Sequence, residues 1–202
     1  MKNLICFGTR PEWLKIKPLI DSSINYSLLY TGQHDDLLKE ILLDYEIKYK
    51  IKIQKSEDRL NSIISSILFN FPDISDFEYV VVQGDTASAF ACALAAFNRG
   101  VKIAHVESGL RSFDLQHPFP EEGYRQMISR ISNLNFCPTY LSKENLIGEK
   151  ALGASHIVGN TVLDNLKNLK TDEINNDVVI TLHRRENHKL IHSWIKQINR
   201  LA

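Results

Sequence analysis

The sequence is poor in cysteine and has no long apolar run, and both absences narrow the classes of protein that it can encode. Three cysteines occur among 202 residues, far apart, at Cys6, Cys92 and Cys137. An odd number without a C-x-x-C pair argues against a disulfide framework or a zinc site and favours a reduced, cytoplasmic compartment. No apolar run approaches the roughly 20 residues of a membrane helix, and none has the form of a signal peptide.

An excess of charge is missing as well. The 24 basic and 24 acidic side chains cancel, so there is no electrostatic reason to expect nucleic acid or an acidic membrane surface as a partner. The sequence also lacks the patterns G-x-x-x-x-G-K-[ST], G-x-G-x-x-G, G-x-S-x-G and H-E-x-x-H. Their absence argues against a P-loop enzyme, a typical dinucleotide-binding dehydrogenase, a serine hydrolase and a zincin.

What the sequence does contain is an alternation of short apolar runs with segments of helical periodicity. The predicted strands are 4–7, 26–30, 50–53, 79–83, 102–106, 135–138 and 156–158. The predicted helices are 11–22, 35–45, 61–70, 87–98, 121–132, 142–150 and 161–169. Such alternation predicts an α/β fold, a Rossmann-like, doubly wound parallel sheet with helices on both faces.

The end of the chain departs from this regular pattern. We expect residues 1–170 to form the main domain, 171–177 to be a polar linker, and 178–202 to form one strand and one helix. One strand and one helix cannot bury an independent core, so they are expected to begin a second domain or to pack onto the first. If they are left uncovered, the strand edge and apolar side chains such as Trp194 favour association or a tight partner.

Acidic residues follow the strands, at the edge where open α/β sheets bind ligands. Asp85 follows the fourth predicted strand, Glu107 follows the fifth, and Glu121 with Glu122 opens the next helix. Three acidic termini at one edge predict general acid and base groups. The alternatives are a helix N-cap for Asp85, a pairing of Glu107 with Arg111, and a favourable helix dipole for the glutamates at the helix start.

Basic side chains accompany the acids at these turns. The candidates for binding substrate are Arg10, Lys15, Arg111, Arg125 and Arg184. Cations near helix N-termini suit a ligand that carries phosphate. His34 and His183 also follow predicted strands. For any one of these residues, a solvated or merely structural role is the alternative.

Six motifs occur in order along the chain. They are G-T-R-P-E at 8–12, Q-G-D-T at 83–86, H-V-E-S-G-L-R at 105–111, P-E-E at 120–122, V-G-N-T-V at 158–162 and H-R-R-E-N at 183–187. Together they resemble the non-hydrolysing UDP-N-acetylglucosamine 2-epimerases over essentially the whole chain. The resemblance implies one half of a two-domain glycosyltransferase-B fold, with a UDP-sugar substrate in the cleft between two Rossmann-like domains.

The resemblance also implies a reaction and the residues that carry it. UDP-N-acetylglucosamine and UDP-N-acetylmannosamine would interconvert by elimination and re-addition of UDP with inversion at C2, without a metal or other cofactor, in nucleotide-sugar metabolism for polysaccharide biosynthesis. By motif, the catalytic residues are Asp85, Glu107, Glu121 and His183, the last on the UDP side. Arg10 and Lys15 match basic residues of the cleft.

Two departures from the family pattern bear on these expectations. Gln33 and His34 match part of an allosteric UDP-N-acetylglucosamine site of bacterial members, but residues 56–60 do not keep its usual pattern. Family chains are also nearly twice as long, and their second domain holds the nucleotide. We therefore expect an epimerase half that needs a C-terminal domain from a second polypeptide or a longer chain, and a homodimer when complete. The alternatives are an inactive or vestigial UDP-sugar-binding fragment and a hydrolysing relative that releases N-acetylmannosamine.

Overall fold

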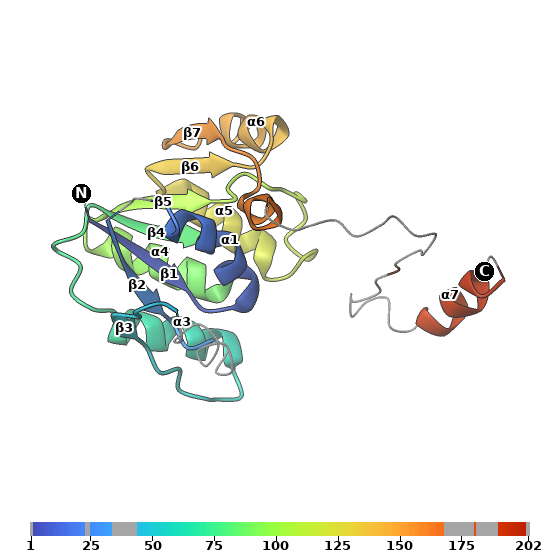
Figure 1. Ribbon diagram of the computed structural model, residues 1–202, viewed down its shortest axis with the longest axis horizontal. Coiled ribbons are helices and arrows are strands. Elements are labelled where there is room, and N and C mark those ends of the chain that lie inside the picture. Colours follow the sequence, from blue (N-terminus) through green and yellow to red (C-terminus); the bar gives the residue numbers. More distant parts are fainter. Residues whose placement is uncertain (1, 23–24, 34–43, 168–179, 181–189, 201–202) are drawn as a thin grey trace. The chain divides into compact units, whose positions relative to one another are not determined.

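A computed structural model describes residues 2–22, 25–33, 44–167, 180 and 190–200 (Figure 1). The chain divides into two compact units, Met1–Asn168 and Leu169–Ala202, and each is considered by itself. The predicted helix at 35–45 and the predicted linker and strand at 171–182 lie almost entirely outside the described residues.

The first unit contains a parallel sheet of seven strands in the order β3-β2-β1-β4-β5-β6-β7 (Figure 1). The strands are β1 (Asn3–Phe7), β2 (Tyr26–Tyr30), β3 (Tyr49–Lys50), β4 (Tyr79–Gln83), β5 (Lys102–Val106), β6 (Leu134–Cys137) and β7 (Ala154–Ile157). The chain builds outward from β1 through β2 to β3 and then returns to β4 on the other side. The predicted doubly wound parallel sheet is therefore confirmed, and its strand order reverses between β1 and β4, where such sheets bind ligands.

Helices cover both faces of this sheet. They are α1 (Arg10–Ile20), α3 (Arg59–Asn70), α4 (Ala87–Asn98), α5 (Glu121–Ile131), α6 (Tyr140–Gly148) and the 3-10 helix η1 (Thr161–Leu166). The helix α4 contacts both α3 and α5 on one face, and α1 contacts η1 on the other (Figure 1). Right-handed crossovers explain this division, because the chain winds in opposite directions from β1.

Alternate residues of the central strands enter two separate cores. Leu4 and Cys6 of β1 pack with side chains of α3 and α4, whereas Ile5 and Phe7 pack with α1 residues such as Trp13. Side chains of a strand alternate between faces, so a strand covered on both sides is apolar throughout. The same alternation places Gln83, two residues beyond Val81, on the α1 face.

Two predicted elements differ from the structure by more than one or two residues at their ends. The strand predicted at 50–53 is the short β3, because Ile51 N donates to Tyr30 O at 2.9 Å and β2 ends there, leaving no partner for the next residues. The helix predicted at 161–169 is, in its described part, the 3-10 helix η1. Its bonds span three residues, as between Leu163 N and Asn160 O at 3.0 Å, so the turn is tighter than in an α-helix.

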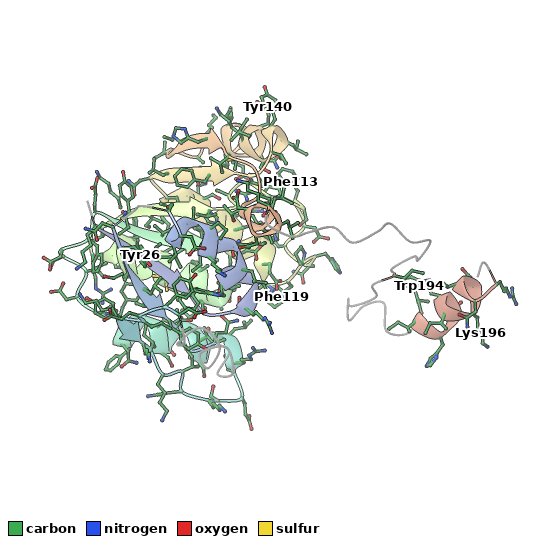
Figure 2. The ribbon with its side chains drawn as sticks, viewed as in Figure 1. Tyr26, Phe113, Phe119, Tyr140, Trp194 and Lys196 are labelled. Atoms are coloured by element: carbon green, nitrogen blue, oxygen red, sulfur yellow. The ribbon has the colours of Figure 1, made fainter. Side chains whose placement is uncertain are left out.

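The described residues of the second unit include the helix α7 (Ile191–Ile198), which confirms the helix predicted at the end of the chain. Trp194 lies on this helix (Figure 2). Among the described residues of the whole chain, no helix has the length and apolar character needed to cross a membrane.

Candidate active site

Three strand-to-helix turns meet at the carboxyl edge of the sheet, after β1, β4 and β5. Gln83 pairs with Val106 in the register of β4 and β5, and Gly84 N donates to Val106 O at 3.0 Å. The residues that follow, Asp85 on one strand and Glu107 on the other, are therefore on adjacent turns. The predicted convergence of acidic termini at one edge is present in the fold.

Glu107 is held between a cation and an amide. Lys15 Nζ, on α1, lies 2.8 Å from Glu107 Oε1 and 2.5 Å from Oε2. The amide Nε2 of Gln83 donates a short hydrogen bond to Oε2. The expected alternative, a pairing of Glu107 with Arg111, is wrong, because strand alternation and the crossover of α1 bring Lys15 to this turn instead.

The backbone at Glu107 is strained. Its φ is 65°, in the left-handed region that side chains other than glycine rarely adopt. Two residues on, Gly109 has a φ of 86°, and a Cβ there would lie 2.1 Å from Ser142 O at the start of α6. Strained positions persist when the surroundings fix them, and they concentrate at functional sites. The strain and the ion pair together single out Glu107.

Asp85 is bound by Arg125 of α5. Arg125 Nη2 donates a short hydrogen bond to Asp85 Oδ2, and its Nη1 lies 3.4 Å from Glu122 Oε2. Burial raises the pKa of Asp85 against the opposing effect of Arg125, and the negative charges of Glu107 and Glu121 raise it further. The three predicted catalytic carboxylates are thus within electrostatic reach of one another.

The N-cap alternative for Asp85 is wrong. The cap of α4 is Thr86, whose hydroxyl oxygen accepts from Ala89 N at 3.0 Å. The Asp85 carboxylate is directed to α5 instead of to the start of its own helix. A carboxylate that is not needed to cap a helix remains available for a ligand.

The two glutamates that open α5 have different surroundings. Glu122 is fully buried and accepts hydrogen bonds from Ser112 N at 3.0 Å and Phe113 N at 3.2 Å. Burial acts to raise the pKa of Glu122, but these bonds and the one from Gln126 outweigh it, so the pKa is lowered. Glu122 therefore fixes the loop after β5.

That loop carries two exposed aromatic rings, Phe113 and Phe119, each 67% exposed (Figure 2). Glu121, which follows the loop, is only partly exposed. Its side chain makes no hydrogen bond or ion pair with any residue that the structure describes. Of the two glutamates, Glu121 is the one whose carboxylate is open to a ligand.

Glu12 is a buried position beneath this edge that the sequence analysis did not single out. Its carboxylate is 2% exposed and joins two of the turns. Oε2 accepts from Gly8 N and Thr9 N, both at 2.7 Å, and Oε1 accepts from the Thr86 hydroxyl at 2.5 Å. The pattern T-x-x-E at 9–12, a helix capping box, was a usable signal.

His105 is a second position that was missed. Its ring is buried in β5, and Nε2 lies 2.7 Å from Gly84 O. A carbonyl oxygen only accepts, so Nε2 carries the proton. Burial lowers the pKa of His105 to about 4, and Arg111 and Arg125 lower it as well, so the ring is neutral near pH 7. This bond anchors the turn that carries Asp85, and the motif H-V-E-S-G-L-R, which begins at His105, was the sequence signal that could have drawn attention to it.

The remaining basic candidates have different surroundings. The buried Arg111 binds Glu149 with both Nε at 2.6 Å and Nη2 at 2.7 Å, a geometry that favours a structural role. Arg10 is exposed in the first turn of α1. His183 and Arg184 lie outside the described residues.

Gln33 borders a separate polar cavity of about 290 Å³ that also includes Lys55 and Arg59. Its Oε1 accepts from Ser88 Oγ at 2.6 Å, near the start of α4. His34, predicted to accompany it, lies outside the described residues. In the part of the chain that the structure describes, no group of three or more metal-ligating side chains is present.

The fold and this acidic edge define the class of protein. It is a Rossmann-like α/β domain with acidic and basic side chains at the carboxyl edge of its sheet, corresponding to half of a glycosyltransferase-B fold. A family model described as UDP-N-acetylglucosamine 2-epimerase matches residues 19–202. The chain belongs to the UDP-N-acetylglucosamine 2-epimerase family.

Individual relatives agree with this assignment. A UDP-N-acetylglucosamine 2-epimerase of Campylobacter jejuni is 40% identical over 219 residues, which cover 92% of this chain and 57% of that protein. The crystal structure of the Neisseria meningitidis enzyme bound to UDP-GlcNAc matches with a TM-score of 0.75 and 37% identity, over 82% of this chain and 48% of that one. The Methanocaldococcus jannaschii enzyme in complex with UDP-GlcNAc and UDP gives a TM-score of 0.71 and 34% identity, over 83% and 50%. The chain spans about half the length of the relatives it matches.

Proposed function

We propose that the first unit supplies the acid and base groups of an enzyme that interconverts UDP-N-acetylglucosamine and UDP-N-acetylmannosamine. The observation that carries this proposal is the grouping of Asp85 and Glu107, on the adjacent turns after β4 and β5, with Glu121 at the start of α5. Family membership supports the reaction, and the relatives with UDP-GlcNAc bound support the substrate.

The chemistry requires two changes at neighbouring carbons. A base removes the proton from C2 as the bond from C1 to the UDP oxygen breaks, which leaves a C1–C2 double bond in 2-acetamidoglucal. UDP then adds back to C1 while a proton is delivered to the opposite face of C2. Inversion therefore calls for acid and base groups on both sides of the sugar ring, and each must be positioned closely because C2–H is a weak acid.

The two bound carboxylates suit these roles. Glu107 is fixed by Lys15 of α1, and Asp85 is fixed by Arg125 of α5, so the partners come from opposite faces of the sheet. Lys15 and Gln83 both donate to the Glu107 carboxylate, so its position is fixed. The raised pKa of Asp85 suits a group that takes up and releases a proton during the reaction. Glu121 is the third acid or base candidate.

The UDP leaving group needs positive charge, which we assign to Arg10, Lys15, His183 and Arg184 together with a second domain. That domain would come from another polypeptide or from a longer chain, and the complete protein is expected to be a homodimer. Gln33 and His34 are proposed to belong to a second ligand site, and Gln33 borders the polar cavity. The buried, free thiols of the three cysteines fit a cytoplasmic location.

The test is proton NMR of UDP-N-acetylglucosamine incubated with the protein in D₂O, alone and with a separately produced second domain. We expect UDP-N-acetylmannosamine carrying deuterium at C2. Asp85→Asn and Glu107→Gln should each slow the reaction by about 100-fold or more. The control Asp73→Asn, an exposed carboxylate before β4, should not.

The same spectra distinguish the two alternative functions, a UDP-sugar-binding fragment without activity and a hydrolysing enzyme. UDP binding without conversion, even after the second domain is added, would contradict the proposal and indicate a UDP-sugar-binding fragment. Release of free N-acetylmannosamine would indicate hydrolysis.

A further inference from the structure

We propose that Gln83 is a positioning residue that sets the direction of the Glu107 carboxylate, an inference that rests on the proposed function. Gln83 is the last residue of β4 and is 3% exposed. Its Nε2 donates to Glu107 Oε2, the same oxygen that lies 2.5 Å from Lys15 Nζ. Lys15 Nζ also lies 2.8 Å from Oε1, so of the two donors only Gln83 distinguishes one carboxylate oxygen from the other.

The two donors differ in what they can fix. An ammonium is a compact point charge on a flexible stem, so Lys15 supplies attraction with little directional preference. A carboxamide is planar, and that of Gln83 extends from a strand in the middle of the sheet. Lys15 therefore supplies charge, and Gln83 supplies direction.

The placement of Gln83 also argues against a role in packing alone. A buried amide is costly unless it is hydrogen-bonded, and the position continues the apolar face of Val81 and Tyr79. An apolar side chain would fill such a position without the need for a partner. The amide instead contacts the one described acidic residue with a left-handed backbone, Glu107.

This assignment predicts a specific kinetic change. Without Gln83, Lys15 still holds Glu107, but the carboxylate can rotate about the ammonium. A displacement of about 1 Å at a catalytic group can slow a reaction about 100-fold. Binding of the UDP portion does not depend on this rotation, so the effect falls on kcat and not on KM.

The first experiment measures exchange of the C2 proton of UDP-N-acetylglucosamine for deuterium. The protein is used alone or with the separately produced second domain, whichever form of the wild type is active. For Gln83→Leu we expect kcat to fall between about 10-fold and 100-fold while KM changes less than about threefold. Gln83→His, which restores an N–H donor, should recover most of the loss. Gln83→Glu, which places a second carboxylate beside Glu107, should move the acidic limb of the pH–rate profile to higher pH.

Gln126→Leu is the matched control, because it removes the same kind of bond, from Gln126 Nε2 to Glu122 Oε1 at 2.8 Å. It should leave the exchange rate within about threefold of the wild type. Equal losses in both variants, or a loss in Gln83→Leu that appears only in KM, would overturn the proposal. Thermal melting of each variant shows whether the fold is retained.

The second experiment does not require turnover. In a ¹⁵N-labelled chain, the side-chain amide signals of Gln83 are assigned by their absence from Gln83→Leu. Glu107→Gln should shift these signals strongly, and Lys15→Met should shift them less. If Glu107→Gln leaves the Gln83 side-chain signals unshifted, the proposal fails even when the enzyme is active. If they respond but the wild type shows no exchange, the proposed function fails and the orientation of Glu107 by Gln83 stands.

Discussion

Removal of the Glu12 carboxylate should strongly destabilise the first unit. Glu12→Ala leaves Gly8 N and Thr9 N without their acceptor, in a site where the glutamate is 2% exposed. It also frees the hydroxyl of Thr86, which donates to Oε1. The turns after β1 and β4 then lose their direct connection.

The magnitude follows from these contacts. Each buried backbone donor left unpaired costs about 1–3 kcal/mol, whereas a hydroxyl can rotate to another acceptor. Relief of the buried charge offsets part of this loss. We therefore expect the free energy of unfolding to fall by about 2–4 kcal/mol, a large share of the roughly 5–15 kcal/mol typical of a domain. Glu12→Gln keeps an oxygen for both backbone donors and should lose only about 1 kcal/mol.

The pH dependence gives an independent test. Burial raises the pKa of Glu12 above its ordinary value of 4.5, although the hydrogen bonds from Thr86, Gly8 and Thr9 oppose the shift. The folded state therefore favours the protonated carboxyl group. The contribution of the Glu12 carboxyl group to the free energy of unfolding is fully present below about pH 4.5. It is lost as the pH rises through the folded-state pKa of Glu12. Because Glu12→Gln cannot ionise, the stability of the wild type relative to this variant should fall as the pH rises from 4.5, the ordinary pKa of this group, through the folded-state pKa of Glu12.

Urea unfolding followed by circular dichroism measures both effects. The midpoint for Glu12→Ala should fall by about 1–2 M, given slopes of about 1–3 kcal/mol per molar urea. Glu57→Ala, at an exposed glutamate, is the control and should stay within about 0.5 kcal/mol of the wild type. A midpoint for Glu12→Ala equal to that of the control would refute the reasoning. A wild-type advantage over Glu12→Gln that grows with pH would refute the assigned sign of the pKa shift.

Three further predictions concern local geometry. Lys150 follows α6 with a φ of 55°, so Lys150→Gly should relieve strain and raise the melting temperature by about 2–4 °C, whereas the mid-helix control Lys143→Gly should lower it. Gly109→Ala should destabilise by about 2 kcal/mol or more in chemical denaturation, because its Cβ would meet Ser142 O at 2.1 Å and its φ is 86°. Burial raises the pKa of the Cys92 thiol well above 9.0, so this thiol should react with a disulfide reagent only after denaturant is added, and fast reaction in the native protein would contradict its burial.

The sequence predicted helices and strands correctly where their ends are determined by the residues of the segment itself. The predicted helix at 87–98 and the predicted strand at 102–106 have the same bounds in the structure, because small or apolar residues continue to a clear break at each end. The strand predicted at 50–53 was displaced, because the end of β3 is set by where β2 stops and not by its own residues.

Only part of the candidate site could be predicted from the sequence. The acids could be placed at one edge because parallel strands end together, but their ionic partners could not be predicted. Lys15 and Glu107 are 92 positions apart, and Arg111 binds Glu149, 38 positions away. These pairings depend on which face each side chain takes and on where a crossover brings the next helix. Neither fact is encoded in the residues near the motif.

The buried polar groups beneath the edge account for the fixed positions of the acids above them. Glu12 joins the turns after β1 and β4, His105 joins β5 to the turn of Asp85, and Glu122 ties the loop after β5 to α5. Each bond connects segments that the chain reaches separately, so the three turns are fixed to one another before any ligand arrives. Acid and base groups act best when their orientation needs no rearrangement during the reaction. On the proposed reaction, therefore, a substitution at Glu12 or His105 that preserves the fold should still reduce turnover, because the turns would keep their residues but lose their relative positions.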